Sequence, residues 1–364
     1  MTFPTTALIP TLTERLARAR ADLGMGVPVV VCDGDHAVMI LAAETLTEQR
    51  LATLKGMDPV LTITAHRAAT LKVPAYDGDI ARVALPNDVD LRWVRAMADP
   101  ADDLSSPMKG PFKPAREGQT DVHRAGIALT KMARLLPACV VAPLDDGSAF
   151  ASMHDLTRLD AKTALDTDLT PLDPVISARL PLDVSEAGRL HIFRPEDGAE
   201  EHYAIEIGNP DRAAPVLARL HSACFTGDVL GSLKCDCGPQ LRGAMVQMGS
   251  EGAGVLLYLN QEGRGIGLAN KMRAYSLQNQ GFDTVEANHR LGFADDERDF
   301  RIGAEILRKL GFSQVRLLTN NPEKIAKLES CGLTVTERVP LKVGENRHNQ
   351  AYLATKAKKS GHLL

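Results

Sequence analysis

The stretch GVLLYLNQEGRGIGLANKMRAYSLQ, residues 254–278, decides the fold class because it joins a strand pattern to a helix pattern. Residues 254–260 are a short apolar run, which is typical of a buried strand. Gly263, Gly265 and Gly267 follow, and glycines let backbone amides approach a ligand. Because glycine-rich turns are also common without a ligand, this turn alone indicates only a strand, a loop and a helix in succession.

The same alternation recurs along the chain. Further strands are predicted at residues 27–33, 137–144 and 314–320, and helices at 13–24, within 296–311 and at 320–332. The last helix has an Asn cap, Pro322 in its first turn and Gly332 after its last turn. Alternating strands and helices predict a mixed α/β fold.

The length of the chain predicts two domains, because 364 residues exceed what one hydrophobic core usually serves. Pro and Asp interruptions near residues 166–183 indicate a linker. We therefore expect an N-terminal α/β domain over residues 1–175 and a C-terminal α/β domain over residues 176–364. Residues 99–120 are polar and rich in Pro and Gly, so they are predicted to form a long surface loop.

The composition excludes some classes of function. Apolar residues make up 44% of the chain and charged residues 24%, and the net charge is −4. A chain without a basic excess lacks the field that drives non-specific nucleic-acid binding. The N-terminus has no signal-peptide pattern, and no apolar run approaches the ~20 residues that span a bilayer. We expect a cytoplasmic protein with no nucleic-acid or membrane partner.

Three of the six cysteines lie within HSACFTGDVLGSLKCDCG, residues 221–238. Disulfides are uncommon in the cytosol, so Cys224, Cys235 and Cys237 are predicted to bind zinc, which prefers thiolates. A catalytic zinc site has three protein ligands and a structural site has four, and His221 is close enough in sequence to be the fourth. The spacing leaves both forms open. Buried thiols and redox chemistry are the alternatives, while the H-x-E and P-C-x-x-C motifs of zinc nucleobase deaminases are absent.

Two other stretches are dense in polar groups. Residues 284–300 gather carboxylates and arginines around His289, and residues 317–324 place Thr, Asn and Lys where a strand turns into a helix. The second arrangement suits a phosphate group. A solvated helix start and a plain N-cap are the simpler interpretations of the two stretches.

Taken in order, these motifs resemble GTP cyclohydrolase II, the enzyme that opens riboflavin biosynthesis. The resemblance covers residues 180–364 approximately and rests on RLHSACFTGD, GSLKCDCGPQL, LYLNQEGRGIGLANKMRAYSLQ, DTVEANHRLGFADDERDF, LLTNNPEK and ERVPL with NQAYLATKAKKSGHLL. It implies hydrolysis of GTP to formate, pyrophosphate and a diaminopyrimidinone ribosylamine phosphate. It also implies that the three cysteines hold one Zn²⁺ per chain, which activates a water to attack C8 of the guanine.

The resemblance assigns roles to further residues. It implies that Asp296 accepts a proton, that Tyr275 acts on the ring-opened intermediate, and that Arg298 acts at the α-phosphate. Arg298 would serve either as a nucleophile or, since a guanidinium stays protonated, as an electrostatic clamp. Substrate contacts are implied, with Mg²⁺ on the triphosphate, at Arg219, His221, Ser222, Gln240, Glu262, Gly263, Arg264, Thr284, Thr319 and Lys324.

One position departs from the family pattern. The usual H-S-E-C is H-S-A-C here, so Ala223 removes a carboxylate close to the expected substrate and zinc. A related cyclohydrolase that uses another purine nucleotide, or that stops at a ring-opened formamide product, is therefore an alternative. A nucleotide-binding regulator with a structural zinc is the alternative outside enzymes. A homodimer is the default assembly.

Residues 10–160 resemble 3,4-dihydroxy-2-butanone-4-phosphate synthase in outline, on VPVVVCDGDHAVMILAAETLT and HRAGIALTKMARLLPACVVAPLDDGSAFASMHDL. Much of that chemistry is missing. The acidic loop is shortened and leaves Asp33 and Asp35, which are too few oxygen ligands for a divalent metal. Pro143 replaces a catalytic Glu, and only His123 remains of an H-T-E segment. The resemblance implies a degenerate, non-catalytic domain that is a scaffold, a dimerisation unit or a regulator.

Overall fold

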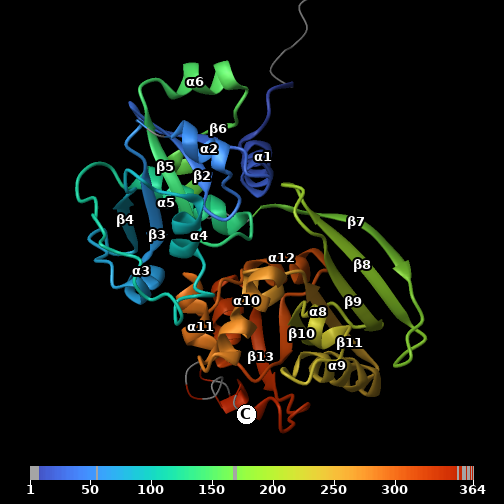
Figure 1. The fold of residues 1–364 in the computed structure, drawn as a ribbon. Helices are drawn as coiled ribbons and strands as arrows, with labels where there is room; N and C mark the ends of the chain where they lie inside the picture. Colours follow the sequence, from blue (N-terminus) through green and yellow to red (C-terminus); the bar gives the residue numbers. More distant parts are fainter. Residues whose placement is uncertain are drawn as a thin grey trace, which may run out of the picture. The chain divides into compact units, whose positions relative to one another are not determined.

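The computed structural model describes residues 8–54, 56–166, 170–350, 352–354, 358, 361 and 363. The chain divides into two compact units, and each is described by itself (Figure 1). The N-terminal unit comprises residues 1–168 and 269–297, and the C-terminal unit comprises 169–268 and 298–364. This grouping differs from the predicted division, because residues 269–297 were expected in the C-terminal domain. Parts of the predicted tail motif at 349–364 lie outside the described residues.

A six-stranded sheet, in the order β4-β3-β5-β2-β1-β6, forms the centre of the N-terminal unit. Its strands are β1 (Val29–Asp33), β2 (His36–Ala42), β3 (Val60–Thr64), β4 (Ile80–Ala84), β5 (Ala138–Leu144) and β6 (Arg158–Asp160). Neighbouring strands are antiparallel except β1 and β6. The strands predicted at 27–33 and 137–144 are confirmed as β1 and β5, whose apolar runs are buried.

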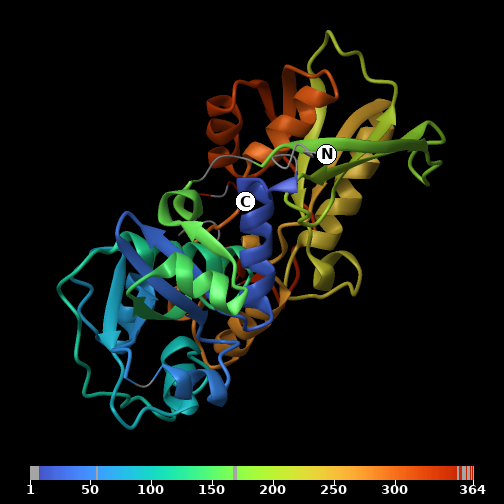
Figure 2. The ribbon, with the colours of Figure 1, turned by 90° about the horizontal axis from the view of Figure 1, so that it is seen from above.

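The described residues of this unit also form helices. They are α1 (Leu12–Gly24), α2 (Glu48–Thr53), α3 (Ala65–Leu71), α4 (Leu91–Ala98), α5 (Asp121–Met132), α6 (Gly147–His154), α7 (Ala161–Leu165), α10 (Leu268–Asn279) and α11 (Thr284–Leu291). The helix predicted at 13–24 is confirmed as α1, which starts at a capping box between Thr11 and Glu14 and packs on α5. Figure 2 shows α1, in blue, as one straight helix. Residues 99–120 form the predicted irregular loop, although Asp103 within it is buried.

A seven-stranded sheet, in the order β13-β12-β10-β11-β9-β8-β7, forms the centre of the C-terminal unit. Its strands are β7 (Leu172–Arg179), β8 (Gly188–Pro195), β9 (His202–Gly208), β10 (Val216–Ser222), β11 (Ala253–Leu259), β12 (Gln314–Leu318) and β13 (Thr334–Val339). The four strands β13, β12, β10 and β11 are parallel, and β9, β8 and β7 continue the sheet in antiparallel fashion. Figure 1 shows β7, β8 and β9 as three long strands that lie side by side.

The helices of the C-terminal unit are α8 (Phe225–Asp228), α9 (Cys237–Glu251), the 3₁₀ turn η2 (Glu262–Gly265), α12 (Arg301–Lys309) and α13 (Pro322–Ser330). The predicted strands at 254–260 and 314–320 are confirmed as β11 and β12. In the predicted helix at 320–332, Asn321 caps α13 by accepting from the Glu323 amide at 3.0 Å. The helix predicted within 296–311 begins only at Arg301.

The linker predicted near residues 166–183 is wrong for its central part. Residues 172–179 form β7, which pairs with β8 along its length, and residues 167–169 lie outside the described residues. Proline is tolerated here because β7 is the edge strand of the sheet.

Alternation along β10 divides the core of the C-terminal unit into two layers. Val216, Ala218 and Leu220 pack with residues of α12 and α13, while Leu217 packs with α9. By the same alternation, Arg219 lies on the same face of the sheet as Leu217. Among the described residues, no helix combines the length and apolar character needed to cross a bilayer.

Candidate functional site

The candidate site of the C-terminal unit lies where parallel strands end. β10 is hydrogen-bonded to β11 on one side and to β12 on the other, all in parallel. Their carboxyl ends therefore lie at one edge of the sheet, where open α/β sheets bind ligands. Ser222 ends β10, Glu262 follows β11 and Thr319 follows β12. Sheet topology thus brings together motifs that are about 100 residues apart along the chain.

The three clustered cysteines meet at this edge. Cys224 follows β10, and Cys237 is the first residue of α9. The three sulfur atoms lie within 4.8 Å of one another, and the Sγ atoms of Cys224 and Cys235 are 3.7 Å apart. All six cysteines are free thiols. The cluster is buried at Cys224 and Cys235 and half-buried at Cys237.

The cluster has the dimensions of a tetrahedral metal site. Zinc binds thiolate sulfur at about 2.3 Å, so two sulfurs of a tetrahedral zinc lie about 3.8 Å apart. Gly227 leaves the necessary room, because a Cβ there would stand 2.8 Å from the Cys235 sulfur and 3.0 Å from the Cys224 sulfur. The donor set and its spacing therefore fit zinc.

The thiols favour a bound cation electrostatically. Hydrogen bonding with Cys224 and burial raise the pKa of Cys235, and hydrogen bonding with the other two thiols and burial raise the pKa of Cys237 further. Repulsion between neighbouring thiolates in the buried cluster adds to this effect. A divalent cation removes this repulsion and makes deprotonation favourable.

His221 lies close to the cluster but is not among the residues whose ligand atoms gather there, within the described part of the chain. Its Nε2 lies 3.0 Å and 3.1 Å from the two carboxylate oxygens of Asp228. Burial lowers the pKa of His221 despite the opposing effect of Asp228, which favours the neutral ring. With Nε2–H donating to Asp228, Nδ1 is a hydrogen-bond acceptor. Among the described residues this buried atom has no partner, so it suits a ligand that donates.

Asp228 is the functional residue that sequence reasoning missed. Its carboxylate accepts from His221, from the Tyr258 hydroxyl at 3.0 Å and from the Cys224 amide at 3.0 Å. One buried side chain therefore orients both the histidine and the backbone of Cys224, a candidate metal ligand. Its position four residues after Cys224, in the turn of α8, was the only signal in the sequence.

Arg219 presents a second buried group with unused hydrogen-bonding capacity. It donates to the Leu318 carbonyl at 3.1 Å and to Gln240 Oε1 at 2.5 Å, and Gln240 in turn donates to Asp236. Burial lowers the pKa of Arg219 to about 10, so it remains positively charged at neutral pH. Within the described part of the chain, its Nε has no acceptor. A buried cation of this kind suits an anionic or carbonyl-bearing ligand.

The turn after β11 has a strained backbone. Glu262 accepts from the amides of Phe225 and Gly263, at 2.6 Å and 2.9 Å, which ties the turn to α8. Gly263 and Arg264 both adopt left-handed φ angles, 64° and 62°. A left-handed arginine is uncommon, and such strain is concentrated at functional sites.

Three more predicted residues of this unit lie at the same strand ends. Arg298 donates to the Ser222 hydroxyl at 3.2 Å, and Lys324 donates to the Leu220 carbonyl at 3.0 Å. The Thr319 hydroxyl accepts from the Asn321 amide at 3.0 Å, at the start of α13. The structure therefore gathers positive charge from α13 and from residue 298 around the end of β10.

Three predicted residues belong to the N-terminal unit instead. Tyr275 lies on α10, Thr284 is the first residue of α11, and Asp296 follows α11. Lys271 lies 5.8 Å from the centre of the Tyr275 ring, and Gln278 donates to the Thr284 hydroxyl at 3.4 Å. Their roles in the reaction stay predictions.

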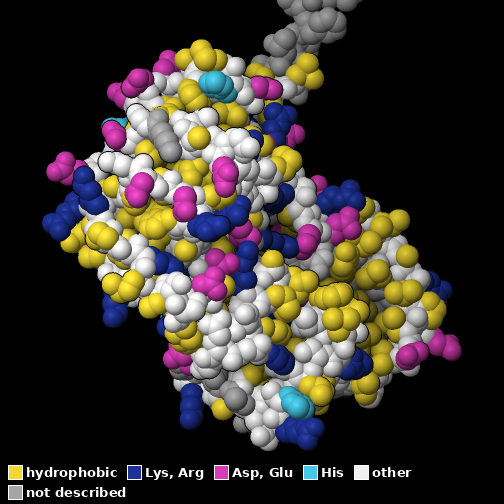
Figure 3. All heavy atoms as spheres, in the orientation of Figure 1, with side chains coloured by type: hydrophobic (Ala, Val, Ile, Leu, Met, Phe, Trp, Pro, Cys, Tyr) yellow, Lys and Arg dark blue, Asp and Glu magenta, His cyan; other side chains and the backbone are white. Residues whose placement is uncertain are grey.

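Hydrophobic side chains lie next to the cysteine cluster. Figure 3 shows them gathered over the part of the C-terminal unit that contains β8, β9, α8 and α9. Phe225, Val229, Leu230 and Leu233, all between Cys224 and Cys235, are exposed. The segment between Cys224 and Cys235 is therefore apolar on its exposed side.

The fold and the site define a class, that of α/β proteins with a three-cysteine cluster that could hold a metal ion at the carboxyl ends of parallel strands. The family model of GTP cyclohydrolase II matches residues 173–340. GTP cyclohydrolase-2 of Azospirillum brasilense is 46% identical over 358 residues, which are 95% of this chain and 93% of that protein. The chain belongs to the GTP cyclohydrolase II family.

Other relatives match different shares of the chain. GTP cyclohydrolase-2 of Azotobacter vinelandii is 59% identical over 175 residues, covering 48% of this chain and 84% of that protein. The riboflavin biosynthesis protein RibBA of Bacillus mycoides is 37% identical over an alignment of 399 residues, covering 96% of this chain and 99% of that protein. Both halves of this chain thus have counterparts among proteins named for riboflavin biosynthesis.

Among solved structures, the chain is similar to RibBX, a two-domain 3,4-dihydroxy-2-butanone 4-phosphate synthase from A. baumannii. The identity is 17%, the TM-score is 0.32, and the similarity covers 89% of this chain and 100% of that chain. A score of this size defines neither the fold nor the function.

Proposed function

We propose that this chain hydrolyses GTP to formate, pyrophosphate and a diaminopyrimidinone ribosylamine phosphate, with one zinc held by Cys224, Cys235 and Cys237. The observation that carries the proposal is the sulfur cluster, which has the spacing of a tetrahedral zinc site and lies beside Arg219 and His221. Zinc, when bound, supplies the Lewis acidity that makes a nucleophile from water near neutral pH.

The residues around the cluster bind and orient the base. Asp228 holds His221 so that Nδ1 accepts a hydrogen bond, which suits an N–H group of guanine. Arg219 and Gln240, joined by a hydrogen bond, present donors from the same side of the sheet. Such fixed donors and acceptors hold C8 of the guanine close to the nucleophile, which removes much of the entropic barrier.

The phosphates need positive charge and backbone amides. Arg264 in its left-handed turn and Lys324 in the first turn of α13 supply charge, and Gly263 and Thr319 supply close backbone and hydroxyl contacts. Mg²⁺ would accompany the triphosphate. We assign Arg298 as an electrostatic clamp on the α-phosphate, because a guanidinium stays protonated and makes a poor nucleophile.

The final steps use residues whose roles rest on the family resemblance. Asp296 would accept a proton, Thr284 would contact the substrate, and Tyr275 would act on the ring-opened intermediate before formate leaves. A carboxylate and a phenol suit such proton transfers.

A turnover assay tests the proposal. Zinc-loaded protein is incubated with GTP and Mg²⁺, and formate and pyrophosphate are measured together. We expect equal amounts of both products, and loss of both with Cys235→Ser. Cys331→Ser is the matched control, because Cys331 lies outside the cluster, and it should keep the wild-type rate. Release of neither product by zinc-loaded wild-type protein would refute the proposal.

A second candidate follows from Ala223, which lacks the usual carboxylate one residue before Cys224. Under this alternative the enzyme stops at a ring-opened formamide product. The same assay distinguishes the two, since pyrophosphate would then appear without formate.

A further inference from the structure

Residues 269–297 are a segment of the cyclohydrolase sequence that packs as part of the N-terminal unit. We call this the 269–297 segment; it contains most of α10 and all of α11. It carries Tyr275, Thr284 and Asp296, three of the residues with proposed roles in the reaction. What holds the segment in place therefore bears on the chemistry.

A buried ion pair lies under the segment. Arg67 of α3 is 1% exposed and Asp103 is 7% exposed, and they form a two-pronged pair with N–O distances of 2.5 Å and 3.0 Å. Lys109 also donates to Asp103. Burial opposes ionisation of Asp103, but the hydrogen bonds from Arg67 and Lys109 outweigh it and lower the pKa of this carboxyl group.

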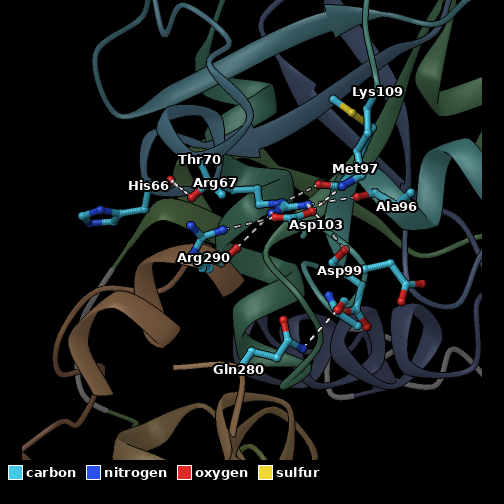
Figure 4. Close-up of polar contacts among 12 residues, drawn as sticks. His66, Arg67, Thr70, Ala96, Met97, Asp99, Asp103, Lys109, Gln280 and Arg290 are labelled. Carbon is cyan, nitrogen blue, oxygen red and sulfur yellow. Dashed lines mark hydrogen bonds and ion pairs between the residues drawn. The ribbon is translucent and has the colours of Figure 1, made fainter. Parts of the chain in front are cut away.

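The pair reaches the segment directly. Arg67 donates to the Arg290 carbonyl at 3.5 Å, and the Arg290 guanidinium lies 3.7 Å from Asp103. Figure 4 shows Arg290 pointing toward Asp103 from the ribbon of the segment. The guanidinium of Arg67 also donates to the carbonyls of Met97, Ala96 and Asp99, so it joins three parts of the chain.

Close packing next to the pair leaves little freedom for α11. Gly292, which ends α11, has a left-handed φ of 90°, and a Cβ there would stand 2.9 Å from both Pro137 and the Thr64 hydroxyl. That hydroxyl donates to the Gly292 carbonyl at 2.7 Å. His66 of α3 stacks on His289 of α11, with ring centres 4.1 Å apart.

Polar contacts also hold α10. Arg273 donates to Glu44 at 2.8 Å and lies 3.2 Å from a carboxylate oxygen of Asp99. Asn270, which is fully buried, donates to the Arg134 carbonyl at 2.9 Å. Gln280, just after the helix, donates to the Ala101 carbonyl at 3.2 Å.

We propose that Arg67 and Asp103 are a positioning pair for the cyclohydrolase reaction, through which the degenerate N-terminal fold holds the 269–297 segment in its working conformation. Buried ion pairs are best attested as devices that select one arrangement of the chain, which is the use proposed here. The N-terminal fold would then be required for turnover although it contributes no chemistry of its own. This role rests on the proposed function for Tyr275, Thr284 and Asp296.

The test compares Arg67→Lys with Arg82→Lys. A lysine keeps the charge but cannot make the planar, two-pronged contacts of an arginine. Arg82 is a matched control in the same unit, because it is 4% exposed and pairs with Asp77 at 2.8 Å and 3.1 Å. Its other hydrogen bond goes to the Glu117 carbonyl, outside the segment.

The first readout is amide hydrogen exchange of residues 269–297 in the full-length protein without substrate. Arg67→Lys should speed exchange in this segment by about tenfold or more, and Arg82→Lys should not. Equal exchange of the segment in the two variants would overturn the proposal. Because this readout needs no GTP, it decides the anchoring even if the wild-type protein proves inactive and the proposed function fails.

The second readout is kcat with GTP per folded, zinc-loaded chain. Arg67→Lys should lower kcat by about tenfold or more with normal zinc content, and Arg82→Lys should leave it near wild type. A purely structural pair would reduce the yield of folded protein without changing kcat per folded chain, and that result would also overturn the proposal.

A milder pair of variants covers the case in which Arg67→Lys does not fold. Thr64→Val removes the hydrogen bond to Gly292 and the side-chain cap of α3. Thr62, in the same strand as Thr64, makes a buried hydrogen bond to His123 of α5, which Thr62→Val removes. Faster exchange of 269–297 and lower kcat are expected for Thr64→Val alone. The same response in both variants would contradict the proposal.

Discussion

At the scale of single residues, Asp228 contacts several groups of the candidate site in the C-terminal unit, although it was not among the predicted site residues. It binds His221, Tyr258 and the backbone of Cys224 from a buried position. Groups that orient metal ligands commonly change metal affinity or activity by 10–100-fold when altered. The carboxylate therefore connects His221, which has a proposed role in substrate binding, to the cysteine cluster.

We expect Asp228→Asn to weaken zinc binding by about tenfold or more, because the amide replaces one acceptor with a donor facing the Cys224 amide or His221. Competition with a chelator measures the affinity. Asp211→Asn is a suitable control, since exposed Asp211 only accepts from the Ala213 amide. Unchanged zinc affinity in Asp228→Asn would remove Asp228 from the site.

His123 is a residue whose charge state affects the stability of the N-terminal unit. The pKa of His123 is lowered to about 4, mainly by burial. The charge of Arg82 lowers it further, and the charge of Asp77 opposes the shift. Its Nδ1 lies 2.7 Å from the Thr62 hydroxyl. The unfolded state therefore binds a proton at higher pH than the folded state, and stability falls as the pH drops from 6.5 toward 4.

For a pKa shift of this size, the free energy of unfolding falls by about 3 kcal/mol in total as the pH drops through this range. We expect His123→Asn to reduce this loss, because the amide can bind Thr62 without titrating. Urea unfolding of the full-length protein at several pH values measures the loss of stability. His154→Asn is the control, because His154 is exposed. An unchanged pH profile in His123→Asn would show that His123 is not responsible.

At the scale of elements, the turn after β11 combines strain with charge. Arg264 holds a φ of 62°, a conformation that glycine adopts at little cost. We expect Arg264→Gly to leave the unfolding free energy of the C-terminal unit unchanged or higher, and to raise the KM for GTP about tenfold by removing a phosphate partner. A loss of stability without a change in KM would mean that Arg264 serves the fold rather than the substrate.

Elements whose signal is local in sequence could be predicted. β1, β5 and β11 are buried on both faces over most of their length, so their apolar runs were unambiguous. In β12, Val315, Leu317 and Leu318 are buried and carry the signal. The cap of α13 depends only on Asn321 and its neighbours. β7 was missed because an edge strand tolerates Pro174 and exposes nearly all of its residues, which leaves no apolar pattern.

The candidate site could be predicted only in part, because only some of its residues have a signal that is local in the sequence. The candidate metal ligands lie within 14 residues of one another, from Cys224 to Cys237, and thiolates have few other uses in that spacing. Asp228 and the pair of Arg67 with Asp103 act through contacts that depend on the folded chain. Carboxylates and arginines are common on surfaces, so sequence alone does not separate these from solvated residues.

At the scale of the whole molecule, sequence family and packing divide the chain differently. The family model extends over residues 173–340, whereas residues 269–297 pack in the N-terminal unit. A sequence boundary follows shared ancestry, while a packing boundary follows buried contacts such as that between Thr64 and Gly292. The proposed anchoring of the 269–297 segment would give the N-terminal fold a use even if, as the sequence predicts, it has no catalysis of its own.

The measurement that tests the central claim most directly is the rate of formate release from GTP as zinc is added back to metal-free protein. We predict that the rate rises in proportion to bound zinc and stops rising at about one zinc per chain, as three thiolates at one centre require. A rate that does not depend on bound zinc would contradict the account.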